Sequence, residues 1–214
     1  MAVVLVTASV LLAAGLAFGA APIIGDGTNH YSSANYTIDQ GEVAQLQVTG
    51  SSHNATANQN GPDNKALFRS PTISGSTTGV NGTQFLGTGD YTFFCTIHPS
   101  TMQATLHVTG NGTPQARPNA ELSLKSKRLS KAVKKGLLVQ VTANSKIDDV
   151  SLTAKLGKAT IGKATVSLAS GTQVDLVKLS KAGKSKLRGR STAKVTVTAA
   201  IPFGSPASAK GKLS

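Results

Sequence analysis

The sequence predicts an all-β chain that folds as two β-sandwiches joined by a linker. Short runs of alternating apolar and polar residues recur between clusters of Gly, Asn and Asp, a pattern typical of sandwich strands. Aromatic residues make up 4% of the chain and Trp is absent, which favours small domains with modest cores. Charge then separates two modules: residues 1–110 carry two bases and five acids, whereas residues 111–214 carry twenty bases and four acids.

The N-terminal segment, residues 1–24, contains no charged residue between Ala2 and Ile24. This run is long enough to span a bilayer, and Ala17-Phe18-Gly19 offers a cleavage site with small residues. We therefore expect either a signal peptide that is removed or an anchor that is retained. Both alternatives place the protein outside the cytoplasm, as a secreted, periplasmic or cell-surface protein.

Residues 25–110 form the first predicted domain. Its strand-like runs are Tyr36–Ile38, Val43–Val48, Gln84–Leu86, Tyr91–Cys95 and Gln103–Val108. Because side chains alternate along a strand, Tyr91, Phe93 and Cys95 should face the core, while Phe94 points outward or packs under a neighbouring loop.

The segment Y-T-F-F-C-T-I-H-P-S-T-M, residues 91–102, combines three side chains that bind soft metals. Cys95 lies three residues before His98 and seven before Met102, and His53 supplies a second imidazole from upstream. Two histidines and one cysteine in a trigonal arrangement, with a distant thioether, form the electron-transfer type of copper site. A lone cysteine is otherwise most often a small buried hydrophobe, so the joint spacing carries the prediction.

On these residues, together with Asn54, the segment 30–109 resembles the blue-copper proteins of the plastocyanin, pseudoazurin and amicyanin group. The resemblance implies a Greek-key cupredoxin sandwich that binds one mononuclear copper ion. It makes His53, Cys95 and His98 the close ligands and Met102 the long axial ligand. Asn54 matches the asparagine that ties the ligand loops together.

The sequence departs from this family at two points. Ile97 precedes His98 where the family usually has a proline, and Pro99 follows it. Three residues separate His98 from Met102, whereas plastocyanin has four and amicyanin two. Gln103 is the alternative axial ligand, through its side-chain oxygen.

The resemblance implies an exported type 1 copper protein that carries single electrons between redox protein partners. We expect that the protein is not an enzyme, because the sequence has no second copper site, no His-x-His pair and no Ser/His/Asp grouping. Phe94, Ile97 and Pro99 are the candidate electron-exchange surface. The alternative functions are a copper-buffering protein without a redox partner and a wall-associated adhesive module.

Residues 111–120 are rich in Gly, Pro and Asn and form a predicted linker. We expect residues 121–203 to fold as a second, immunoglobulin-like sandwich and residues 204–214 to form a flexible tail. The lysine-rich runs are Leu137–Thr142, Val150–Leu156, Ala164–Leu168, Val174–Leu179 and Ala193–Ile201. The tetrapeptide L-S-K-A is repeated, at 129–132 and at 179–182, and each copy precedes a similar predicted strand. The segment loosely resembles lysine-rich β-domains of bacterial surface proteins.

The net charge of +16 over residues 111–214 raises the question of an anionic partner. Nucleic acid is a poor candidate, because Phe203 is the only aromatic residue after position 110 and cannot form a stacking platform. An anionic cell-wall polymer, a membrane surface or an acidic redox partner fits better, and the alternative is a merely solvated surface. We expect a monomer.

Overall fold

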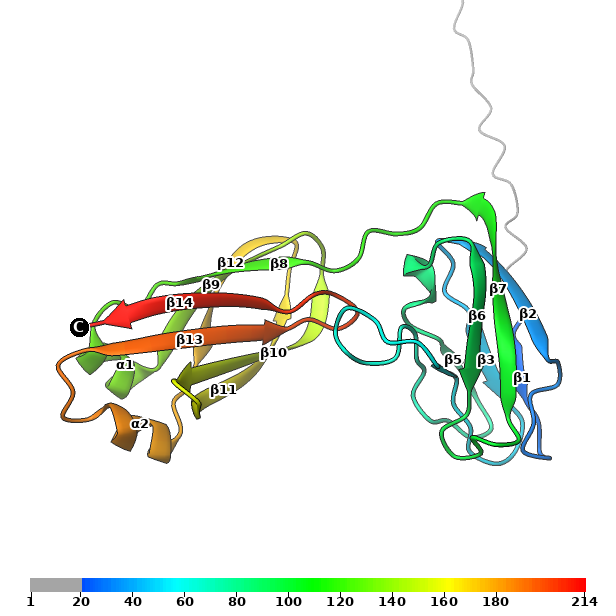
Figure 1. Ribbon diagram of the computed structural model, residues 1–214, viewed down its shortest axis with the longest axis horizontal. Helices are drawn as coiled ribbons and strands as arrows, with labels where there is room; N and C mark the ends of the chain where they lie inside the picture. The colour runs from blue at the N-terminus through cyan, green and yellow to red at the C-terminus, as the bar shows by residue number, and fades with distance from the viewer. Residues whose placement is uncertain (1–20) are drawn as a thin grey trace, which may run out of the picture.

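The computed structural model describes residues 21–214 and consists of two all-β domains, which confirms the predicted fold class (Figure 1). The first domain packs a three-stranded sheet, β1-β3-β5, against a four-stranded sheet, β2-β7-β6-β4. The strands are β1 (Ile23–Gly25), β2 (Asn35–Gln40), β3 (Gln45–Val48), β4 (Thr56–Ala57), β5 (Thr77–Gly79), β6 (Gly89–Phe94) and β7 (Gln103–Gly112). Leu46, Phe68, Phe93 and Leu106 are completely buried in its core.

Two parts of this domain differ from the sequence prediction. The predicted strand Gln84–Leu86 is wrong, because Thr83–Phe85 forms the 3-10 helix η1. The buried Thr83 hydroxyl accepts a hydrogen bond from Ala44 N and donates to Val80 O, which holds the chain in a turn. The ordered domain also starts earlier than residue 25, because Ile23 is buried and pairs with Leu46. Residues 1–20 of the predicted leader lie outside the described part of the chain.

The second domain has seven antiparallel strands in two sheets, β12-β9-β8 and β11-β10-β13-β14. The strands are β8 (Ala120–Leu124), β9 (Leu137–Ala143), β10 (Ile147–Leu156), β11 (Ala159–Leu168), β12 (Gly171–Val177), β13 (Ala193–Ala200) and β14 (Ala207–Leu213). The strand order matches that of immunoglobulin constant domains except that the fourth strand joins the opposite sheet.

The prediction of a flexible tail at 204–214 is wrong, because Ala207–Leu213 forms β14 and pairs with β13 along its whole length. Ala209 and Leu213 face the core while Lys210 and Lys212 face solvent. Lysines on the solvent face of an edge strand discourage pairing with another chain. The tail therefore completes the second sandwich.

The repeated L-S-K-A segments lie at the starts of two short helices, α1 (Leu129–Lys135) and α2 (Lys181–Leu187), and Ser180 of the second segment is the N-cap of α2. Each helix precedes a strand, β9 or β13, and the two helices lie side by side. Leu129, Ala132 and Leu187 anchor them to the core. Within residues 21–214, no helix is both long and apolar enough to cross a bilayer.

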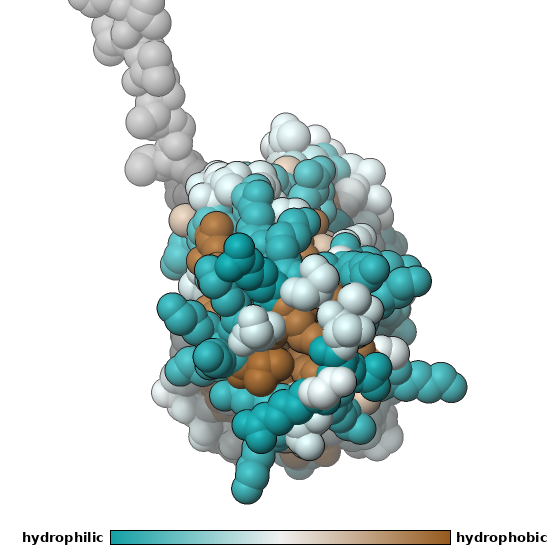
Figure 2. All heavy atoms as spheres, turned by 90° about the vertical axis from the view of Figure 1, so that its left-hand side faces the viewer, coloured by the Kyte–Doolittle hydropathy of each residue, from teal (hydrophilic) through white to brown (hydrophobic). Residues whose placement is uncertain are grey.

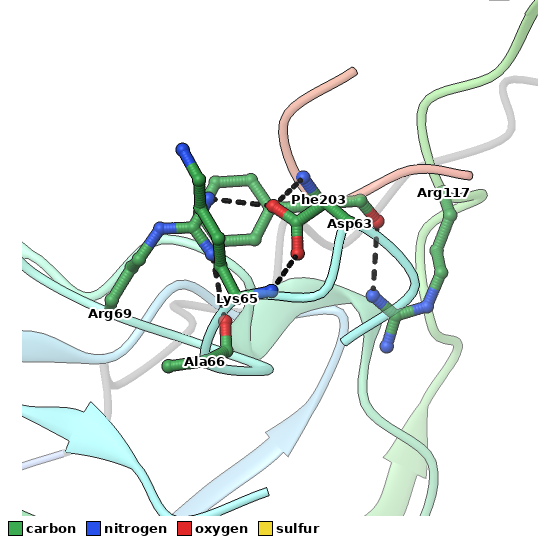
Figure 3. A network of polar contacts seen from close by, with 6 residues as sticks. All are labelled: Asp63, Lys65, Ala66, Arg69, Arg117 and Phe203. Atoms are coloured by element: carbon green, nitrogen blue, oxygen red, sulfur yellow. Dashed lines mark hydrogen bonds and ion pairs between the residues drawn. The ribbon is translucent and has the colours of Figure 1, made fainter. Parts of the chain in front are cut away.

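A loop of the second domain packs on the first domain through Phe203 (Figure 3). The guanidinium carbon of Arg69 lies 4.1 Å from the centre of the Phe203 ring. The Phe203 backbone N–H donates to Asp63 Oδ2 at 3.0 Å, and Asp63 pairs with Arg69 at 2.8 Å. Arg117, in the connection between the domains, donates to the Phe203 carbonyl at 3.3 Å. These contacts hold the two domains together.

Candidate metal centre

The loop between β6 and β7 carries three of the four predicted ligands. Its backbone is closed by hydrogen bonds from His98 N to Cys95 O at 3.1 Å and from Met102 N to His98 O at 3.0 Å. A third bond, from Cys95 N to Met102 O at 3.0 Å, joins the two ends of the loop. Cys95, His98 and Met102 are thus presented from one tight, internally bonded turn.

His53 approaches this loop from the segment between β3 and β4. Its backbone exchanges two hydrogen bonds with Ile73, each 2.9 Å long. Its ring Nε2 lies 2.8 Å from the carbonyl oxygen of Asp26 and 3.1 Å from Ser51 Oγ. Because a carbonyl can only accept, Nε2 carries the proton, and Nδ1 of the neutral ring is left free to bind a metal.

The three close donors converge on one point. Cys95 Sγ lies 3.9 Å from His53 Nδ1 and 3.9 Å from His98 Nδ1, and all three atoms are within 4.8 Å of one another. Metal bonds of about 2.0 Å to nitrogen and about 2.3 Å to sulfur, meeting at about 120°, would place sulfur and nitrogen about 3.7 Å apart. One transition-metal ion therefore fits among these donors with little movement of the side chains.

Met102 completes the set. It is fully buried, and its terminal methyl and the Cδ2 of His53 both lie against Gly25, 3.1 and 3.0 Å from where a Cβ on that glycine would stand. The alternative axial residue, Gln103, is exposed and donates to Pro99 O at 2.7 Å. One thiolate, two imidazoles and a thioether are the donor set of a type 1 copper site, and these residues fit it.

Asn54 connects the segment that carries His53 with the segment that carries Cys95. Its side-chain oxygen accepts from Thr96 N at 2.9 Å, and its side-chain nitrogen donates to the hydroxyls of Thr96 and Thr72 at 2.7 and 2.9 Å. Its carbonyl oxygen accepts from Tyr31 Oη at 2.6 Å. Burial, together with the nearby Cys95, raises the pKa of the Tyr31 phenol far above its usual value, so Tyr31 remains a donor.

The site opens to solvent only at one edge. His53 and Cys95 are fully buried, whereas His98 is partly exposed. Ile97, which is 47% exposed, and Pro99 flank His98, and Phe94 is half-buried. The Asp26 carbonyl and Gly25 were not identified from the sequence, because a backbone carbonyl or a missing side chain leaves no motif. Ser51 was not identified either, because a serine near a histidine is common in loops.

The other histidines lie outside the site. The His30 ring contacts the Thr28 carbonyl at 2.8 Å, and His107 is exposed and pairs with Asp90. Within residues 21–214, the structure brings together no further group of three potential metal-binding side chains.

Comparison with known proteins found similarity only to solved structures. No protein-family model matches the chain, and no match was found among curated proteins. A reduced Cu(I) amicyanin mutant at pH 4 is 18% identical with a TM-score of 0.32, covering 41% of this chain and 82% of that one. Another reduced amicyanin mutant is 21% identical with a TM-score of 0.35, covering 45% and 88%. A purple cupredoxin from Nitrosopumilus maritimus is 24% identical with a TM-score of 0.33, covering 42% and 99%.

Proposed function

We propose that this chain is an exported one-electron carrier that holds a single type 1 copper ion in its first domain. The observation that supports this is the convergence of Cys95 Sγ, His53 Nδ1 and His98 Nδ1 within 4.8 Å of one another. Met102, buried beside them, would supply the thioether donor. Copper bound there would supply cycling between Cu(I), which favours sulfur, and Cu(II), which favours nitrogen.

The protein contributes a donor set that is fixed before the metal binds. The His53 ring is held by Asp26 O and Ser51, and the loop of Cys95, His98 and Met102 is closed by its own backbone bonds. Because these donors have little freedom to rearrange, a copper ion held by them would meet nearly the same donor geometry in both oxidation states. Small rearrangement is the condition for rapid electron transfer.

His98 is the proposed route for electrons, because it is the one close ligand with an exposed edge. Ile97 and Pro99 form an apolar rim around it, with Phe94 beside them. Residues 91–106 contain no Asp, Glu, Lys or Arg, so the loop that carries His98 is itself uncharged. We assign docking of a redox protein to this rim.

Absorption spectroscopy of the copper-loaded protein tests the site. A thiolate bonded to Cu(II) in the trigonal arrangement gives an intense visible band, which Cys95→Ser should abolish. His107→Asn is the matched control, because His107 is exposed on β7 and lies outside the cluster. Persistence of the band in Cys95→Ser would refute the ligand assignment.

Voltammetry of the same protein separates electron transfer from copper storage. An electron carrier should give a reversible one-electron wave, with the same spectrum before and after a complete cycle. A copper-buffering protein would instead release the ion on reduction or respond irreversibly. The second result would reject the carrier function while leaving the copper site intact.

A further inference from the structure

The positive charge of the second domain is concentrated at one end. Residues 125–136 and 178–191 each contain six Lys or Arg and no Asp or Glu, so together they hold twelve of the domain's bases. Both segments lie at the same end, because Val177 pairs with Leu137 and α1 contacts α2. We call these two segments the basic tip.

Most acids of this domain lie away from the basic tip. Glu121 pairs with Thr142, near the linker, and Asp148 and Asp149 lie at the start of β10. That start faces the end of β13, which leads into the Phe203 contact with the first domain. Asp175 belongs to the middle of β12 and receives hydrogen bonds from Gln173. The basic tip therefore contains no acidic side chain of its own to offset its twelve cations.

Exposed apolar side chains lie next to the basic tip, on the adjoining ends of β9 and β12. Leu138 and Leu176 are direct partners on β9 and β12 and are 46% and 39% exposed, and Val174 on the same face is 54% exposed. The two leucines line a groove of about 600 Å³ that five cations surround, among them Lys127, Arg128 and Lys131. Figure 2 looks onto this end and shows apolar side chains at its centre within a hydrophilic surround.

Exposed leucines beside a cluster of cations favour an anionic lipid surface over a soluble polyanion as the partner. Farther along the same sheet face, toward the linker, the outward residues Gln140, Thr142 and Thr172 are polar, so the apolar positions cluster toward the cationic end. A soluble polyanion would bind the cations but leave Leu138 and Leu176 in water. An anionic lipid surface offers phosphates to the cations and an apolar interior to the leucines.

We propose that the basic tip docks on an anionic phospholipid surface, with Leu138 and Leu176 inserted between headgroups and the cations around them on phosphates. The tip lies at the end of the second domain that points away from the copper domain (Figure 1). Docking there leaves the His98 edge free for a redox partner. The second domain then acts as the element that localises the copper domain to a membrane.

Co-sedimentation of the full-length protein with vesicles tests this proposal. Phosphatidylcholine vesicles containing phosphatidylglycerol should bind the protein, with affinity falling as salt rises, and pure phosphatidylcholine should not. The variant Lys127→Ser/Arg128→Ser/Lys131→Ser should bind about a hundredfold more weakly, since each cation near the surface contributes about fivefold. The control Lys155→Ser/Lys163→Ser/Lys210→Ser removes the same charge from the outer face of the other sheet and should change binding far less.

The leucines decide between a lipid surface and a polyanion. Leu138→Thr/Leu176→Thr should weaken vesicle binding by about tenfold or more but leave binding to linear polyphosphate unchanged. Equal loss of vesicle binding in the two triple variants would overturn the proposal. So would absence of vesicle binding, or polyphosphate binding as tight as vesicle binding without an effect of the leucine substitutions. The visible copper band serves as a separate readout, so failure of the copper site would leave this result interpretable.

Discussion

The side-chain oxygen of Asn54 accepts a hydrogen bond from the backbone N–H of Thr96 at 2.9 Å, and so joins the residue after His53 to the residue after Cys95. The amide nitrogen of Asn54 adds a bond to Thr96 Oγ1 at 2.7 Å. A buried side chain that binds no metal therefore helps to fix the position of His53 relative to Cys95. Two segments separated by about forty residues act as one rigid unit at this point.

Asn54→Ala should loosen the site and lower the stability of the first domain by about 1–3 kcal/mol, because it leaves buried polar groups unpaired. The tyrosines of the protein, Tyr31, Tyr36 and Tyr91, all lie in this domain, so tyrosine fluorescence during urea unfolding reports on it alone. Asn58→Ala is the matched control, because Asn58 is exposed and its side chain bonds to Thr92 only. Equal unfolding midpoints for the two variants would contradict this role.

Gly25→Ala should distort the copper site without removing a ligand. An added Cβ would stand 3.0 Å from His53 Cδ2 and 3.1 Å from the Met102 methyl, closer than ordinary contacts, so one of the two side chains must move. We expect the visible band to remain but to shift in energy, together with a change in reduction potential. Gly27→Ala is the control, because its nearest neighbour would be Thr49 O at 4.0 Å. Identical spectra for the two variants would show that this contact has no effect.

The contact between the domains should weaken in acid. Burial raises the pKa of the Asp63 carboxyl, but the hydrogen bonds from Phe203 N–H and Arg69 outweigh it, so the pKa lies below its ordinary value of 3.8. A lowered pKa in the folded state means that Asp63 stabilises the contact above about pH 3.8 and loses this effect as the pH falls through the folded value. Small-angle X-ray scattering should show the two domains separating in this range.

Asp63→Asn is the matched variant for this titration. Its side-chain oxygen can still accept from Phe203 N–H, but it carries no charge to bind Arg69. In Asp63→Asn, lowering the pH through the range in which Asp63 titrates should therefore not change the separation of the domains. If both proteins respond to pH in the same way, another group controls the contact.

The candidate metal-binding group could be predicted from the sequence because Cys95, His98 and Met102 lie within one loop and their side chains have a distinctive chemistry. The Asp26 carbonyl that orients His53 could not be predicted, since a backbone oxygen is the same in every residue. The η1 turn depends on a bond between Thr83 and the distant Ala44. Likewise, the run A-S-A-K-G-K-L at 207–213 has too few large apolar residues to indicate a strand, and its pairing depends on β13.

The C-terminal strand should be essential for the second domain. Leu213 is fully buried in its core, and Leu213→Ala should destabilise the domain by about 2–5 kcal/mol, the cost of a cavity at a buried leucine. The control Leu138→Ala removes the same atoms from an exposed position and should cost less than about 0.5 kcal/mol. Unfolding followed by far-ultraviolet circular dichroism, at denaturant concentrations where tyrosine fluorescence remains native, reports on the second domain alone. Equal midpoints for both variants would mean that β14 contributes nothing to the stability of this domain.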